Sequence, residues 1–223
     1  METKFPLAST AALFADPARC AMLTALLDGG ERAAGELAMA ANVSAQSASM
    51  HLAQLLEGGL LAVSRNGRNR FYRLSRPEVA NAIEALGAIS TPQRYIPSGA
   101  NHALCYARTC YDHLAGELGV RLTDTFLRKG MLRPKGEREF EMLPPGEKLL
   151  KKWDIDSSRL RQTRRCFARR CMDWTERREH LAGAVGAAIC QKFLDRHWVR
   201  RHQQSRALRV TAEGERELNR LFA

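Results

Sequence analysis

The sequence has no long apolar run and no recognisable secretory leader. Its longest apolar stretch, from Leu181 to Cys190, is too short and too rich in alanine and glycine to span a bilayer. The N-terminus does not combine a basic start, an apolar middle and a small-residue cleavage site in that order. We therefore expect a cytoplasmic protein without a membrane partner.

Catalytic signatures are also missing. No Gly-x-Gly-x-x-Gly follows an expected strand, and neither a P-loop nor a Gly-x-Ser-x-Gly motif occurs. The C-terminal part, of about 120 residues, is short for a dinucleotide-binding catalytic unit. A nucleophile made of Cys110 with His113 or His180 stays open, although no family signature surrounds it. We expect a protein that is not an enzyme and has no cofactor.

Acidic and basic residues are balanced in the first part of the chain and unbalanced in the second. The formal net charge is +11, yet eight basic and eight acidic residues cancel up to Pro92, and beyond it 27 basic and 16 acidic residues differ by eleven. A basic total favours nucleic acid or another anion as a partner. The arginine-rich segment 159–170 fits extra DNA contact, an anionic effector or a solvated face, and the last is the simplest.

Size and hydrophobic spacing predict two domains of the α+β class, mainly helical with small β-hairpins. The chain has 223 residues, of which 45% are hydrophobic and 26% charged, an ordinary globular composition. We expect an N-terminal winged helix-turn-helix domain at 1–91, a linker at 92–102 that contains prolines and a glycine, and a C-terminal domain at 103–223.

The segment 42–74 is the most informative. Ser44 can cap a helix in which Ala48, Leu52 and Leu55 recur at helical spacing, so the opposite face carries short polar side chains suited to base edges in a major groove. A hairpin follows, with Asn66-Gly67 favouring a type I′ turn, and arginines 65, 68, 70 and 73 surround it. Tyr72 is expected to brace the hairpin. The predicted DNA contacts are Ser44, Gln46, Ser47, Met50, His51, Gln54, Arg65, Asn66, Arg68, Arg70 and Tyr72.

These motifs resemble the DNA-binding domain of ArsR-family transcriptional regulators over roughly residues 8–90. The match rests on Asp-Pro-x-Arg from Asp16, on Ser-x-x-Ser-x-x-x-His-Leu in the recognition helix and on the Arg-Asn-Gly-Arg wing. The resemblance implies a homodimeric repressor that reads an inverted repeat in double-stranded DNA. It also implies a dimer interface formed by the helices around Leu13 and Phe14 and around Val79, Ile83 and Leu86. A winged helix that binds another protein, and a basic protein that coats DNA without sequence choice, are the alternatives.

The resemblance does not extend to the metal sites of metal-sensing members. The third helix, AAGELAMAA, and the last helix of the domain, PEVANAIEALGAI, offer neither thiolate nor imidazole ligands. Without a secretory leader, the six cysteines are expected to be reduced thiols, and Cys20, with apolar neighbours, to be a buried small residue. Any sensing is therefore expected in the C-terminal domain.

The C-terminal domain contains an internal repeat. HLAGELGVRLTDTFL from His113 and HLAGAVGAAICQKFL from His180 share seven of fifteen residues at an offset of 67. A hairpin and a short helix are expected after each, which predicts a duplicated helix-hairpin-helix, winged-helix-like unit at 113–152 and 180–222. A crevice between the two copies would be an ordinary place for a small-molecule or redox effector.

Two strings, CYDH and CMDW, supply the candidate effector residues of this domain. Thiolate, carboxylate and imidazole groups suit zinc or a softer metal, and a thiol among arginines suits redox sensing. The strings lie 61 residues apart rather than 67, and cysteines five residues apart do not share a helical face. We therefore assign no metal site and favour packed cysteines, aspartates that cap helices or pair with arginine, and a structural hydrogen bond for each histidine. The alternative is a pair of imidazoles that meet at the pseudo-axis and line a pocket with Trp174 and Tyr111. The candidate effector residues are Cys110, Tyr111, Asp112, His113, Cys171, Asp173, Trp174 and His180.

Overall fold

A computed structural model describes residues 7–67, 69–91, 100–202 and 205–223, and these fall into two units. The division lies between Ile83 and Glu84, inside one helix, rather than after residue 91. Most of the predicted linker lies outside the described residues, and its last three residues begin a helix at Ala100. None of the helices in the described segments has the length and apolar character needed to cross a bilayer.

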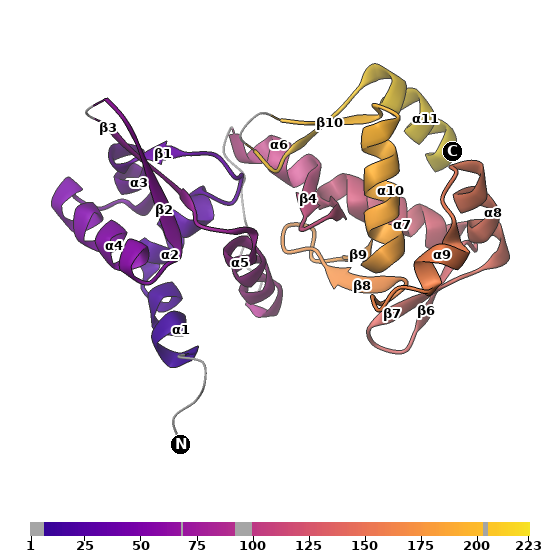
Figure 1. Ribbon diagram of the computed structural model, residues 1–223, viewed down its shortest axis with the longest axis horizontal. Helices are drawn as coiled ribbons and strands as arrows, with labels where there is room; N and C mark the ends of the chain where they lie inside the picture. Colours follow the sequence, from indigo (N-terminus) through magenta and orange to yellow (C-terminus); the bar gives the residue numbers. More distant parts are fainter. Residues whose placement is uncertain (1–6, 68, 92–99, 203–204) are drawn as a thin grey trace. The chain divides into compact units, whose positions relative to one another are not determined.

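The N-terminal unit is a winged helix-turn-helix (Figure 1). Its three strands form an antiparallel sheet in the order β1-β3-β2, in which β2 and β3 make the wing. Helix α5 begins in this unit and continues past its boundary. The elements are α1 (Leu7–Ala15), α2 (Pro17–Ala25), β1 (Arg32–Ala33), α3 (Ala34–Ala41), α4 (Ala45–Glu57), β2 (Leu61–Asn66), β3 (Asn69–Leu74) and α5 (Pro77–Ile89).

Side-chain caps start two helices of this unit, and the cap at Ser44 is the one that the sequence predicted. Asp16 accepts a hydrogen bond from the Arg19 amide at 2.9 Å, and Ser44 accepts one from the Ser47 amide at 3.2 Å. Asn42 ends α3 in the left-handed conformation with φ 52°, which turns the chain toward α4. These caps fix where the two helices of the helix-turn-helix begin and end. The apolar faces of the helices and the wing enclose a core that includes Met22, Leu23, Leu26, Leu37, Leu52, Leu55 and Tyr72.

The C-terminal unit repeats one order of elements, a hairpin, a helix, a hairpin and a helix (Figure 1). The first set follows α6, and the short helix α9 separates the two sets. The elements are α6 (Ala100–Tyr106), β4 (Arg108–Cys110), β5 (His113–Ala115), α7 (Gly116–Arg128), β6 (Leu132–Lys135), β7 (Glu139–Met142), α8 (Pro144–Lys152), α9 (Ser157–Arg161), β8 (Arg169–Met172), β9 (Glu179–Ala182), α10 (Gly183–Asp195), β10 (Val199–Arg201), β11 (Leu208–Val210) and α11 (Ala212–Phe222).

The two sets of elements pack against each other through their hairpins and their long helices. Strands β6, β7, β8 and β9 form one sheet in that order, so the second hairpin of the first set lies beside the first hairpin of the second set. The remaining two hairpins are separate two-stranded sheets that are linked by an isolated bridge between Arg108 and Ala207, beside which the Thr109 amide donates to the Arg206 carbonyl at 3.0 Å. Helix α7 contacts β9, and helix α10 contacts β5. The two sets therefore share one core instead of folding side by side.

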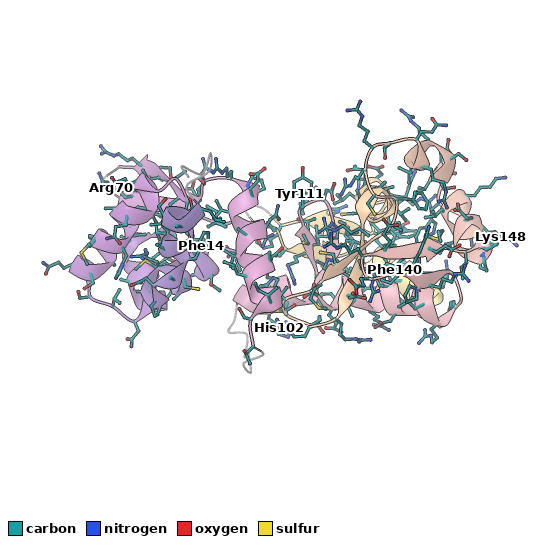
Figure 2. All side chains as sticks on the ribbon, turned by 90° about the horizontal axis from the view of Figure 1, so that it is seen from below. Phe14, Arg70, His102, Tyr111, Phe140 and Lys148 are labelled. Carbon is teal, nitrogen blue, oxygen red and sulfur yellow. The ribbon has the colours of Figure 1, made fainter. Side chains whose placement is uncertain are left out.

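That core is closed by aromatic side chains next to the two long helices. Trp153 makes edge contacts with Phe193 and Trp198, at ring-centroid distances of 5.4 and 5.9 Å. Phe126 and Phe193, from α7 and α10, are fully buried, and Phe140 of β7 lies in the interior of the same unit (Figure 2). The fold is mixed α and β with a winged helix-turn-helix at its N-terminus, as the sequence predicted.

Candidate functional site

Helix α4 presents one polar face to solvent. Ala48, Leu52 and Leu55 are buried as predicted, while Gln46 and Met50 are exposed, Met50 at 57%. The same face also includes Ser49 and Ala53, which the sequence analysis missed. Their spacing from Gln46, three and seven residues on, is the helical signal that could have found them.

Two predicted DNA contacts on α4 are instead held by their own domain. His51 has a side chain only 14% exposed, and its Nδ1 lies 3.8 Å from Oδ1 of Asp16. Gln54 accepts a hydrogen bond from Nη1 of Arg19 at 2.7 Å. Ser44 and Ser47 are joined through their hydroxyls at 3.1 Å, as part of the cap. The exposed face near the start of α4 therefore centres on Gln46, Ser49 and Met50.

The wing carries its arginines in register. Arg65 of β2 pairs with Arg70 of β3, both are exposed, and cross-strand partners point to the same face of a hairpin. Figure 2 shows Arg70 at the periphery of the N-terminal unit. Arg73 is turned toward Glu31, with Nε and Oε1 3.4 Å apart. Arg68, the remaining predicted arginine, lies outside the described residues.

Two expectations for the wing are corrected. Asn66 belongs to β2 and pairs with Asn69, so it is a strand residue and not a central residue of the turn. Gly67 has φ +60°, but Asn66 is absent from the described residues with positive φ. Tyr72 is only 4% exposed because its ring packs in the core, so it braces the wing from inside and is not placed to contact DNA.

In the C-terminal unit, two hairpins each place a cysteine opposite a histidine. Cys110 of β4 pairs with His113 of β5, and Cys171 of β8 pairs with His180 of β9. The separation of 61 residues between the cysteines, against 67 between the histidines, arises in the loops. Two residues join Cys110 to His113, whereas eight separate Cys171 from His180. The interpretation that the two strings are not equivalent is therefore wrong at the level of strand register.

The four side chains converge on one point. One sulfur or nitrogen atom from each of Cys110, His113, Cys171 and His180 lies within 4.8 Å of the others. The two Nε2 atoms are 3.0 Å apart, and the rings stack with centroids 5.0 Å apart. The alternative in which the imidazoles meet is thus confirmed in this respect, and the cysteines are more than packing residues. We call this set the Cys/His cluster.

Carboxylates lie behind both imidazoles. Nδ1 of His113 is 3.4 Å from Oδ1 of Asp112, and Nδ1 of His180 is 3.4 Å from Oδ2 of Asp173. Asp173 is fully buried, and both of its carboxylate oxygens accept from Nη2 of Arg108, while one also accepts from the Gly116 amide at 2.7 Å. Asp112 accepts a bidentate pair from Arg165. The prediction that the aspartates pair with arginine is confirmed.

These contacts set the protonation of the cluster. Burial opposes ionisation of Asp173, but Arg108 and the Thr175 hydrogen bond hold the pKa of its carboxyl well below the usual range. A hydrogen bond with Cys171, together with burial, raises the pKa of Cys110 to about 12. The same hydrogen bond lowers the pKa of Cys171.

Glu84 of α5 contacts the Cys/His cluster, which sequence reasoning missed. It is only 6% exposed, and its Oε2 accepts a hydrogen bond from the Cys110 thiol at 3.2 Å. Its Oε1 accepts from Arg206 at 3.0 Å and from Nε1 of Trp174 at 3.2 Å. Burial opposes its ionisation, but Arg206 and Arg108 lower the pKa of the Glu84 carboxyl. Helix α5 carries two acidic residues, Glu78 and Glu84, and its sequence does not show which of them is buried.

Three other predicted features differ from expectation. Tyr111 is 61% exposed and points outward (Figure 2), so it lines no pocket with Trp174. Cys20 is exposed rather than buried. In the arginine-rich segment, Arg161, Arg165 and Arg170 form ion pairs with acidic side chains of the same unit, so that segment is only partly a solvated face.

Comparison with known proteins agrees with this geometry. A family model described as a helix-turn-helix domain matches residues 14–64. The HTH-type transcriptional regulator YdfF of Bacillus subtilis (strain 168) is 41% identical over 212 residues, which cover 93% of each chain. The chain belongs to the HTH-type transcriptional regulators, as the resemblance to the ArsR family implied.

Shorter similarities of this regulator fall on its N-terminal part. The biofilm growth-associated repressor of Agrobacterium fabrum is 39% identical over 75 residues, which cover 34% of this chain and 63% of that protein. The crystal structure of the transcriptional repressor BigR from Xylella fastidiosa is 29% identical and covers 39% of this chain and 88% of its own, with a TM-score of 0.36.

Proposed function

We propose that this regulator is a homodimeric repressor that binds an inverted-repeat operator and responds to an effector through its C-terminal unit. The main observation in support is the exposed polar face of α4, followed by a wing in which the paired residues Arg65 and Arg70 are both exposed. A helix of this polarity fits a major groove, and guanidinium groups on a hairpin contact phosphates or enter a minor groove. The buried apolar face of α4 holds that surface on the domain core.

Exposed apolar side chains on the first and last helices of the winged-helix region support dimerisation. Leu7 of α1 is 75% exposed, and Leu86 and Ile89 of α5 are 44% and 83% exposed. The family resemblance implies a dimer interface on these two helices. Burying such side chains against a second copy would remove apolar surface from water, which is the main favourable term in association.

We infer that the C-terminal unit is a duplication and that its role is regulatory rather than catalytic. Matching inter-hairpin hydrogen bonds support the duplication, because the Arg170 amide donates to the Arg138 carbonyl as the Thr109 amide donates to the Arg206 carbonyl. The raised pKa of Cys110 argues against a thiolate nucleophile at that residue, because the thiol is not the nucleophilic form.

Selection of bound duplexes from a random pool tests the proposal. We expect an enriched inverted repeat with half-sites about one helical turn apart. The enriched duplex is then titrated with the wild type, with the Arg65→Ala/Arg70→Ala variant, and with Arg216→Ala/Arg220→Ala on α11, which removes the same charge from the C-terminal unit. Only the wing variant should weaken binding. Equal affinity for enriched and random DNA would indicate an architectural protein, and no DNA binding would indicate a protein-interaction module; either would overturn the proposal.

A further inference from the structure

We propose that Cys110, His113, Cys171 and His180 bind one metal ion of the zinc class through two sulfur and two imidazole nitrogen donors. The regulatory meaning of this site rests on the function proposed above, but the site itself does not. It lies wholly in the C-terminal unit and is separate from the helix α3 and helix α5 positions considered in the sequence.

The donor atoms are close to the spacing that such an ion needs. Zinc bonds of about 2.0–2.1 Å to nitrogen and 2.3 Å to sulfur place the corners of a tetrahedron about 3.3–3.8 Å apart. The Nε2 atoms of His113 and His180 are 3.0 Å apart, and all four donors lie within 4.8 Å of one another. Shifts of a few tenths of an ångström to about one ångström would complete a tetrahedron.

The imidazoles are oriented for metal binding by the groups behind them. A histidine ligand usually donates its second ring N–H to a carboxylate, which fixes the tautomer and points the other nitrogen at the metal. Asp112 occupies that position for His113, whereas Asp173 lies 3.4 Å from Nδ1 of His180 without a hydrogen bond between them, so a small shift would be needed there. The hydrogen bond between the two Nε2 atoms holds one proton between them, and a cation that binds both nitrogens would replace that proton.

The backbone brings the two halves close enough for this arrangement. Gly119 of α7 lies against His180, and Gly186 of α10 lies against His113, where added Cβ atoms would approach the histidine Cβ to 3.7 and 3.2 Å. Each hairpin then contributes one sulfur and one nitrogen from paired positions. The cluster is therefore built symmetrically by the fold and does not depend on a chance approach of surface side chains.

The composition of the cluster indicates which metals it takes and what they do. Two cysteines and two histidines suit zinc, and Co²⁺ and Cd²⁺ as its substitutes, better than Mg²⁺ or Ca²⁺, which prefer oxygen. Four protein donors fill a tetrahedral shell and leave no position for a reacting water. His113 and His180 are 5% and 1% exposed, so the site is closed to substrates as well. It is a structural or sensing site.

Metal binding at this site would affect α5 through the contact between Cys110 and Glu84. The Cys110 thiol donates to Glu84, and coordination of that sulfur as thiolate replaces its proton with the metal and removes the donor. Glu84 keeps Arg206 and Trp174 as partners. Because α5 begins in the winged-helix core with Val79, loading of the site changes the contacts of a helix that contributes to the DNA-binding domain.

Cobalt titration of the full-length, reduced, metal-free chain tests the site. We expect one Co²⁺ per chain, with visible bands of tetrahedral cobalt and thiolate-to-cobalt charge transfer, and displacement by Zn²⁺. Cys171→Ser and His180→Gln should lose these bands. Cys105→Ser and Cys166→Ser, which change two cysteines outside the cluster, should keep them. Asp112→Asn should weaken binding about 10- to 100-fold.

A measurement on the wild type keeps the proposal falsifiable if a variant fails to fold. X-ray absorption of the zinc-loaded chain should show two sulfur neighbours at about 2.3 Å and two nitrogen neighbours at about 2.0 Å. A different shell would overturn the proposal. No metal uptake by the reduced chain, or a Cys110–Cys171 disulfide as the stable form under reducing conditions, would also overturn it.

The regulatory part has its own readout. Zinc should change the affinity for the selected operator by about 5- to 150-fold, the usual range of coupling between two sites. Glu84→Gln should keep the cobalt bands but reduce the change in operator affinity that zinc causes. Equal operator affinity with and without zinc would overturn the regulatory part. Metal binding is measured without DNA, so failure to find an operator would leave its result unaffected.

Discussion

Arg108 and Asp173 form a fully buried ion pair, in which Nη2 of the arginine lies 2.9 and 3.0 Å from the two carboxylate oxygens. The pair joins β4 to the loop after β8 and so connects the first hairpins of the two sets. It also holds Asp173 behind His180. The Cys/His cluster thus depends on a contact that belongs to the core.

Loss of this pair should destabilise the C-terminal unit strongly. Arg108→Met removes the arginine partner of the buried Asp173 carboxylate, a change that typically costs about 3–5 kcal/mol. Urea unfolding followed by tryptophan fluorescence measures the loss. Arg133→Met is the matched control, because Arg133 pairs with Glu141 at the surface and should show little change. Equal stability of the Arg108 variant and the wild type would contradict this account.

The glycines between the two halves should be intolerant of a methyl group. A Cβ at Gly119 would lie 2.5 Å from the Leu114 carbonyl oxygen, and one at Gly186 would meet the equivalent carbonyl of Leu181. Either alanine substitution should lower the free energy of unfolding by about 1–3 kcal/mol. Gly35→Ala on α3 meets nothing within 4 Å and should gain about 0.5–1 kcal/mol from helix propensity. Thermal unfolding should show a lower melting temperature for the Gly119 and Gly186 variants and a higher one for the Gly35 variant.

The sequence predicted the N-terminal unit well because its signals are local. The Ser44 cap and the spacing of Leu52 and Leu55 each act within a few residues. The wing was misplaced by one residue because Asn66-Gly67 is a good turn in isolation, whereas the strand register continues through Asn66. The contacts of His51 with Asp16 and of Gln54 with Arg19 could not be predicted, because those partners belong to α2 and its cap.

The Cys/His cluster was harder to predict because it depends on register between distant strands. The repeat identified His113 and His180 as equivalent, but the longer loop between Cys171 and His180 hid the equivalence of the cysteines. Pairing positions across each hairpin, rather than counting along the chain, is the comparison that would have shown it. Glu84 could not be placed because its partners are up to 122 residues away.

Wing arginines should change the salt dependence of DNA binding. Each phosphate contact adds about 0.9 to the slope of log affinity against log salt. Arg65→Ala and Arg70→Ala should each reduce the slope by about that amount and weaken binding to operator and random duplex alike. Titrations at several salt concentrations measure this, and an unchanged slope would remove the wing from the interface.

Residues on the α4 face should instead affect discrimination. Gln46→Ala is expected to narrow the difference between operator and mutated operator by about 1–3 kcal/mol while leaving the salt slope unchanged. Gln54→Ala serves as the comparison, because Gln54 is held by Arg19. Competition with single-base operator variants measures both. A larger effect at Gln54 than at Gln46 would reverse our assignment of the reading face.

The Asp16 cap should make the stability of α2 depend on pH. The Arg19 amide lowers the pKa of Asp16, so the folded carboxyl ionises more readily than the unfolded one. Its contribution is present above the unfolded pKa of about 3.9 and is lost as pH falls through the folded value. Asp16→Ala should cost about 1 kcal/mol at neutral pH and less in acid. The free energy of unfolding of the wild type and of Asp16→Ala, measured at neutral and at acidic pH, tests whether the stabilisation falls in acid. Asp16→Asn serves as the control.

Thiol labelling should separate two cysteines clearly. Cys20 is exposed, while burial raises the pKa of Cys190 to about 11 and leaves its side chain 2% exposed. Alkylation of the native chain at pH 8, followed by peptide mass spectrometry, should modify Cys20 rapidly. Cys190 should react only on unfolding, since about one thousandth of it is thiolate and reagent cannot reach it. Rapid native labelling of Cys190 would contradict its burial.

The two hairpins that carry Cys110 and Cys171 are parts of one polypeptide. A site divided between separate subunits comes apart on dilution, because its halves must meet by diffusion. Here the connecting chain keeps the halves at a fixed effective concentration, whatever the amount of protein. Occupancy of the four side chains is therefore set by the free ligand alone, even when a cell contains only a few copies of the protein.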